Sequence, residues 1–204
     1  LEPKEVFHFF EEISKIPRPS YKEGQISDYL VNFAKERNLE VYQDEIKNVV
    51  IIKEATRGYE NVEPIIIQGH MDMVCEKEPG YEIDFEKEGL TLQVNGDYLS
   101  AKGTTLGGDD GIAVAYALAI LDSHTIAHPR LEVIITVCEE VGMDGATALE
   151  LPMITGKRML NLDSEQEGGM LVSCAGGCTT VCKLPVSFTS EHGQIVTVRI
   201  GGLL

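Results

Sequence analysis

The feature that most constrains this chain is a short apolar run that leads directly into metal-type ligands. Ile65 to Gln68 is dominated by branched apolar side chains, which is typical of a strand buried on both faces of a sheet. Gly69 and His70 follow at once, with Asp72 two positions further on. In open α/β sheets, sites form at the carboxyl ends of strands. A His there can bind a metal through one ring nitrogen while a nearby carboxylate holds the other.

The same order of residues recurs twice downstream. Leu131 to Cys138 is an apolar run followed by Glu139 and Glu140, and Met159 to Leu162 is followed by Asp163. Two adjacent carboxylates after a buried strand repel each other unless a cation or a proton lies between them. Adjacent side chains also point in different directions, so that one can bind a metal while the other transfers a proton. The convergence of several strand ends therefore indicates a metal site.

A glycine-rich stretch, Gly103 to Gly108, precedes Asp109 and Asp110. A phosphate-binding loop would end in Gly-Lys-Ser/Thr, whereas this stretch ends in two carboxylates that would repel phosphate. The sequence therefore disfavours a nucleotide-binding α/β domain. The acidic pair could cap the apolar helix predicted from Gly111 to Leu121, which is the commoner use of Asp at a helix start, or it could bind a cation.

Composition excludes several classes of partner. The formal net charge of −16 argues against nucleic acid or an anionic membrane surface. Five cysteines, with no secretory signal ahead of them, argue against a disulfide framework. No apolar run approaches the roughly 20 residues of a membrane span. We therefore expect a cytoplasmic protein with neither a nucleic-acid nor a membrane partner. Cys174, Cys178 and Cys182 are interpreted as buried or free thiols.

Alternating strands and helices predict an α/β fold with a mixed, largely parallel sheet and helices on both faces. Ser20 to Glu23 matches a capping box and predicts a helix start, and Asn38 would close that helix. From about Val181 the pattern changes to extended runs. Periodicity predicts helices over 5–14, 111–121 and 146–150, strands over 41–43, 48–53, 65–68, 131–138 and 159–162, a hairpin over 90–101, and extended runs over 182–188 and 195–200.

Four motifs in order resemble those of the M20 metallopeptidases, and within them the aminoacyl-histidine dipeptidase (peptidase D, or cytosolic non-specific dipeptidase) subgroup. The motifs are Gly69 to Cys75, Gly103 to Gly111, Glu139 to Met143 and Asn161 to Glu165, and residues 16–20 and 174–177 are similar to that subgroup too. The resemblance covers nearly the whole chain. It implies a zinc-peptidase-like catalytic domain over residues 1–181 and the beginning of an α+β lid or dimerisation domain over 182–204. The implied activity is metal-dependent hydrolysis of Xaa-His and other dipeptides.

The resemblance also implies a ligand set. A pair of zinc ions, with Co or Mn as alternatives, would be bridged by Asp109. One ion would also take His70 and Asp163. The other would take Glu140 and a His near the far C-terminus, for which this chain offers no match.

Two further roles follow from the same resemblance. Asp72 would orient His70, and Glu139 would be the general base. Two cations would lower the pKa of a shared water, whose proton Glu139 would take and then hand to the leaving amine. The subgroup often has Asn where this chain has Asp110, which adds a negative charge beside the site.

We therefore expect the N-terminal portion of a longer enzyme that hydrolyses dipeptides and forms a homodimer through its lid domain. This portion alone is expected to be inactive. The alternative is a non-catalytic fragment that keeps a partial metal-binding scaffold.

Overall fold

The computed structural model describes residues 1–164, 168–173, 176, 178, 180–190, 193–194 and 196–198. One compact unit runs from Leu1 to Glu165 and a second from Gln166 to Leu204. The described residues of the second unit include no helix or strand, and residues 182–188 are not a strand. The run predicted over 195–200 lies partly outside the described residues. So do the last residue of the motif that ends at Glu165 and three of the four residues of the motif at 174–177, Cys174 among them. A lid domain beginning at residue 182 stays a prediction.

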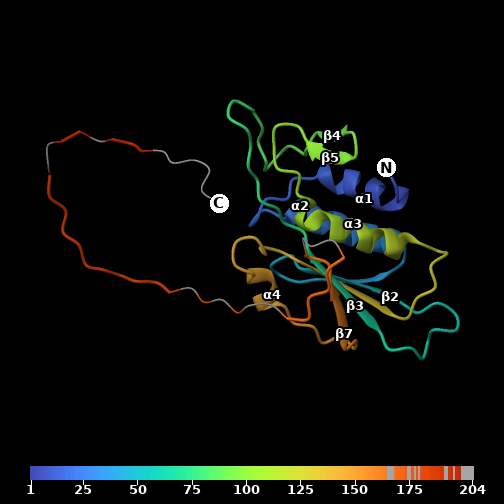
Figure 1. Ribbon diagram of the computed structural model, residues 1–204. Helices are drawn as coiled ribbons and strands as arrows, with labels where there is room; N and C mark the ends of the chain where they lie inside the picture. The colour runs from blue at the N-terminus through green and yellow to red at the C-terminus, as the bar shows by residue number, and fades with distance from the viewer. Residues whose placement is uncertain are drawn as a thin grey trace. The chain divides into compact units, whose positions relative to one another are not determined.

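A mixed sheet of five strands carries the first unit, in the order β1-β2-β6-β3-β7 (Figure 1). β1 pairs antiparallel with β2, and β2 with β6, whereas β3 is parallel to both β6 and β7. The predicted α/β fold is confirmed, and its parallel pairs are confined to the β6-β3-β7 half. The strands are β1 (Glu40–Gln43), β2 (Val49–Lys53), β3 (Ile65–His70), β6 (Leu131–Thr136) and β7 (Arg158–Asn161).

The register of the parallel half brings three strand ends to one edge of the sheet. His70 at the end of β3 pairs with Thr136 of β6, and Gln68 of β3 pairs with Asn161 of β7. Because parallel strands share their carboxyl edge, the acidic residues that follow β6 and β7 lie beside His70.

α2 and α3 pack on one face of this sheet and α1 packs against α3, and most of the apolar core lies among them. α1 and α3 lie side by side, with a hairpin of β4 and β5 next to α1 (Figure 1). Apolar side chains of residues 149–154, which follow α4, pack against the opposite face. These elements confirm the predicted helices and hairpin: α1 (Lys4–Ser14), α2 (Gly24–Glu36), β4 (Leu92–Asn95), β5 (Tyr98–Ala101), α3 (Gly108–Asp122) and α4 (Asp144–Ala148).

The capping box predicted over Ser20 to Glu23 is wrong. α2 begins at Gly24, and its N-cap residue Glu23 makes no side-chain capping bond. Ser20 Oγ instead donates to Asp72 Oδ2 at 2.8 Å, and Glu23 Oε1 accepts a bond of 2.9 Å from the Cys138 amide. Both side chains are committed to strand ends of the sheet, so neither caps the helix.

The acidic pair at the start of α3 does not cap that helix either. The N-cap is Gly107, in the left-handed region with φ 64°, and a glycine has no side chain with which to cap the helix. Asp109 and Asp110 have non-helical dihedral angles within the first turn. This irregular start leaves both carboxylates available for contacts with the end of β3.

Residues 111–121 of α3 are almost entirely apolar, so burial of this part of the helix should contribute strongly to the free energy of unfolding. Leu118 is fully buried, so Leu118→Ala should lower the free energy of unfolding by about 2–5 kcal/mol. The same change at Leu160, which is 52% exposed, should lower it by about 0.5 kcal/mol. Urea denaturation measures both values, and equal losses would contradict the placement of α3 in the core.

Candidate metal centre

His70 lies at the carboxyl end of β3 with its side chain 1% exposed. Its Nδ1 is 3.2 Å from Asp72 Oδ1 and 3.1 Å from the backbone oxygen of Asp72, so Asp72 holds this ring nitrogen with both its carboxylate and its carbonyl. Its Nε2 faces three other acidic side chains, at 3.1 Å from Asp109 Oδ1, 3.7 Å from Glu139 Oε2 and 3.8 Å from Asp163 Oδ2. The structure therefore brings together, around one nitrogen, acidic residues that follow β6 and β7 and one that begins α3.

The carboxylate of Asp72 is fully buried and connects the ends of β3 and β6. It accepts hydrogen bonds from the Glu139 amide at 3.1 Å and the Glu140 amide at 3.3 Å, in addition to the bond from Ser20. Burial by itself raises the pKa of Asp72, but the bonds from His70, Ser20 and the Glu139 amide outweigh it and lower the pKa. Asp72 is therefore held as an anion that fixes both the imidazole and the backbone of the acidic pair.

Two groups of three side chains have ligand atoms within 4.8 Å of one another. One group is His70, Asp109 and Glu140, and the other is His70, Asp110 and Asp163. All four ligands suggested by the sequence fall in these groups. His70 belongs to both, and the ring nitrogen that it offers away from Asp72 is Nε2.

Asp110 is a member of the second group, although the family resemblance gave it no ligand role. Its side chain is buried, and its Oδ2 accepts a bond of 3.0 Å from the His70 amide. Burial raises the pKa of Asp110 to about 7, and Asp163 and Asp109 contribute to that rise. The Asp110 carboxylate lies so close to the backbone of β3 that a Cβ at Gly69 would be 2.5 Å from Asp110 Oδ2. Its position next to Asp109 was the one feature of the sequence that could have placed Asp110 in a ligand group.

Electrostatics in the cluster favour protonation of several carboxylates. Burial is the main cause that raises the pKa of Glu139, while His70 lowers it. Burial, followed by the charge of Asp109, raises the pKa of Glu140. For His70, burial lowers the pKa, but Asp72, together with Asp110 and Asp163, outweighs burial and raises it to about 9. The cluster thus has an excess of negative charge that a cation would offset.

Two cavities adjoin the cluster. One of about 160 Å³ is lined by Asp109, Asp110 and Asp163, and another of about 270 Å³ is lined by Glu139 and Asp163 among mostly apolar side chains. The residues that face His70 Nε2 are therefore accessible to small molecules from outside the core.

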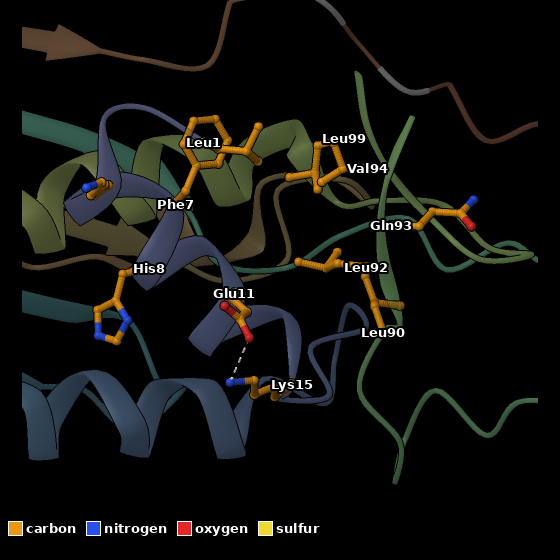
Figure 2. A pocket seen from close by; sticks show the side chains of 11 residues that line it. Leu1, Phe7, His8, Glu11, Lys15, Leu90, Leu92, Gln93, Val94 and Leu99 are labelled. Carbon is orange, nitrogen blue, oxygen red and sulfur yellow. Dashed lines mark ion pairs between the residues drawn. The ribbon is translucent and has the colours of Figure 1, made fainter. Parts of the chain in front are cut away.

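A larger groove, of about 520 Å³, lies between α1 and the β4–β5 hairpin (Figure 2). Its rim carries an ion pair of 3.3 Å between Lys15 and Glu11. None of the candidate ligands lines this groove. The acidic cluster, and not the groove, is the candidate functional site.

Comparison with known proteins connects this cluster to peptidases. Residues 66–174 match the sequence profile of peptidase family M20/M25/M40. The chain is 42% identical to the cytosol non-specific dipeptidase of Escherichia coli over 177 residues, which cover 87% of this chain and 36% of that protein. Within the described residues, no helix is long and apolar enough to cross a membrane.

Solved structures give the same fold. The aminoacylhistidine dipeptidase from Vibrio alginolyticus matches with a TM-score of 0.80 and 42% identity, over 82% of this chain and 34% of that one. Aminopeptidase PepT from Bacillus cereus matches with a TM-score of 0.65 and 27% identity, over 80% of this chain and 44% of that one. The chain spans about a third of the length of the Escherichia coli and Vibrio relatives.

The sharing of His70 by both ligand groups makes a specific prediction. His70→Ala should weaken Co²⁺ binding by more than about 100-fold, because changes behind a ligand already cost 10–100-fold. Glu140→Gln, which alters one group alone, should cost less. His124→Ala, at an exposed His, serves as the control and should bind Co²⁺ as the unaltered chain does. Co²⁺ titration followed by absorption measures each affinity, and unaltered binding by His70→Ala would contradict the site.

Proposed function

Because the chain belongs to peptidase family M20/M25/M40, we propose that it forms the catalytic, metal-binding part of a metal-dependent dipeptidase. The observation that carries the proposal is the setting of His70, with Nδ1 held by Asp72 and Nε2 at 3.1 Å from Asp109. The Escherichia coli and Vibrio relatives are named as dipeptidases. On that basis the proposed substrates are dipeptides, Xaa-His among them.

One imidazole and several carboxylates form a donor set that suits Zn²⁺, with Co²⁺ and Mn²⁺ as alternatives. We propose two zinc ions, with His70 and Asp163 as ligands of one, Glu140 as a ligand of the other, and Asp109 between them. Asp109 suits this role better than Asp110, because its side chain is about half exposed. Asp110 is buried and its Oδ2 already accepts the His70 amide.

When bound, the cations would supply Lewis-acid activation of the attacking water and of the scissile carbonyl. Glu139 is proposed as the general base, because burial raises the pKa of its carboxylate and it lies within 3.7 Å of His70 Nε2. It would take a proton from water as the new C–O bond forms. The same proton would pass to the amine nitrogen as the C–N bond breaks. Asp72 would hold Glu139 in place through its backbone amide.

The rest of the enzyme belongs to the same proposal. A lid domain would begin near residue 182 and would carry the homodimer contact and the groups that recognise the termini of the dipeptide. A cytoplasmic location is proposed because the Escherichia coli relative is named as a cytosol enzyme.

A substitution of the proposed base separates proton transfer from metal binding. In the full-length enzyme, Glu139→Gln should lower kcat by about 10²–10⁴-fold, because glutamine keeps the shape and loses the base. Zinc content should stay nearly unchanged. Glu150→Gln, at an exposed Glu near the site in sequence, is the matched control and should leave both values unaltered. Zinc loss in step with activity would instead make Glu139 a ligand.

The 204-residue chain by itself should have no useful dipeptidase activity. Both ligand groups include His70. If one ion takes its imidazole, the other would keep two carboxylates, fewer than the three protein ligands usual at a catalytic zinc. The ion that takes the imidazole should still bind. The test is to count bound zinc in the purified chain and to assay Xaa-His dipeptides. Turnover close to that of the full-length protein would refute the need for further ligands, and absence of bound zinc would refute the metal site.

A further inference from the structure

We propose that Arg18 is a positioning residue for the metal centre. Its buried guanidinium connects the loop after β3, which carries Asp72, to the start of α3, which carries Asp109. The inference rests on the proposed metal site but concerns a residue with no assigned part in it.

The guanidinium of Arg18 forms its hydrogen bonds with backbone carbonyls of both loops. Nη1 donates to Met71 O at 3.1 Å and to Asp72 O at 3.3 Å. Nη2 donates to Gly107 O at 2.5 Å, at the N-cap of α3. The carbonyl of Arg18 in turn accepts a bond of 3.2 Å from the Met73 amide. One residue therefore fixes the end of β3 relative to the start of α3.

Burial makes this contact sensitive to the identity of the side chain. Arg18 is 2% exposed, and burial lowers the pKa of its guanidinium to about 10, although Asp72, Asp110 and Glu140 act in the opposite direction. An apolar replacement would leave three carbonyls without this donor and remove a positive charge from the acidic cluster. A lysine would keep the charge but could not reproduce the planar fork of donors.

Glycines in the facing loop make room for the guanidinium. A Cβ at Gly107 would lie 2.4 Å from Arg18 Nη2, and one at Gly111 would lie 2.6 Å from the same atom. A Cβ at Gly108 would come no closer than 3.8 Å to any neighbouring group. Gly111→Ala therefore presses mainly on the Arg18 side chain without altering it, although its Cβ would also lie 3.3 Å from Phe10 Cε2. Gly108→Ala is the matched control.

The segment that carries Arg18 also contacts the residues that follow β3 and those that follow β6. Ser20 donates to Asp72 after β3, and Glu23 accepts from Cys138 after β6. These bonds are independent of Arg18 and show that residues 18–23 are built against the site. Arg18 is the member of this segment that extends the contact to the start of α3.

The test compares Co²⁺ affinity and the Co²⁺ absorption spectrum in variants of the 204-residue chain. Arg18→Met and Gly111→Ala should each weaken binding by about 10–100-fold, the cost typical of groups behind a metal ligand. The double variant should lose much less than the product of the two, because both remove the same contact. Arg18→Lys should recover part of the affinity, and Gly108→Ala should bind normally.

A structural control distinguishes positioning from loss of stability. Arg37 pairs with Asp122 at 2.6 Å and stacks 3.8 Å over Phe33, at the other end of α3. Arg37→Met should lower the melting temperature without changing Co²⁺ affinity or the spectrum. If Arg18→Met and Gly111→Ala behave like Arg37→Met, the inference is wrong while the metal site stands.

Failure of the unaltered chain to bind Co²⁺ would overturn the proposed metal site. Hydrogen exchange of the metal-free chain would then still test whether Arg18 holds the two segments together. Arg18→Met should speed exchange of the Met73 and Gly111 amides, which bond to Arg18 O and Gly107 O. Arg37→Met should not. Unchanged exchange of both amides in Arg18→Met would overturn the positioning role by itself.

Discussion

The structure of the site depends on one buried anion, the carboxylate of Asp72. An unpaired charge at this depth would be strongly unfavourable, so the chain surrounds it with donors: the imidazole of His70, the hydroxyl of Ser20 and two successive backbone amides. These donors come from the end of β3, the loop before α2 and the turn after β6. Satisfying one carboxylate therefore fixes three segments that are distant in sequence.

On the other side of the His70 ring, at Nε2, several carboxylates lie close together. Asp109, Asp110, Glu139, Glu140 and Asp163 gather around His70 Nε2, and burial raises the pKa of several of them. Such an excess of like charge opposes folding and is typical of functional sites, where a ligand offsets it. Asp72 and Arg18 belong to the supporting layer, which has its own hydrogen-bond partners, while the facing carboxylates form the layer suited to a cation.

Periodicity in the sequence was sufficient to predict most elements, because burial of one face dictates the spacing of residues such as Phe9 and Phe10 in α1. The capping box failed because the partners of Ser20 and Glu23 lie 52 and 115 residues away, and a local pattern carries no information about them. The insertion of β6 between β2 and β3 is likewise not written in chain order. The strand ends did predict that Glu139 and Asp163 would lie beside His70, but not that Asp110 turns toward the His70 amide.

If the edge of the parallel strands brings His70 and carboxylates to one cation, crystallography of the zinc-loaded chain with anomalous scattering at the zinc edge should locate that cation. We expect an anomalous peak about 2.0–2.2 Å from His70 Nε2 and from a carboxylate oxygen of Asp109, Glu140 or Asp163. Nδ1 should remain on Asp72. A peak remote from His70, or zinc bound through Nδ1 with Asp72 displaced, would show that the cation is not held in this way.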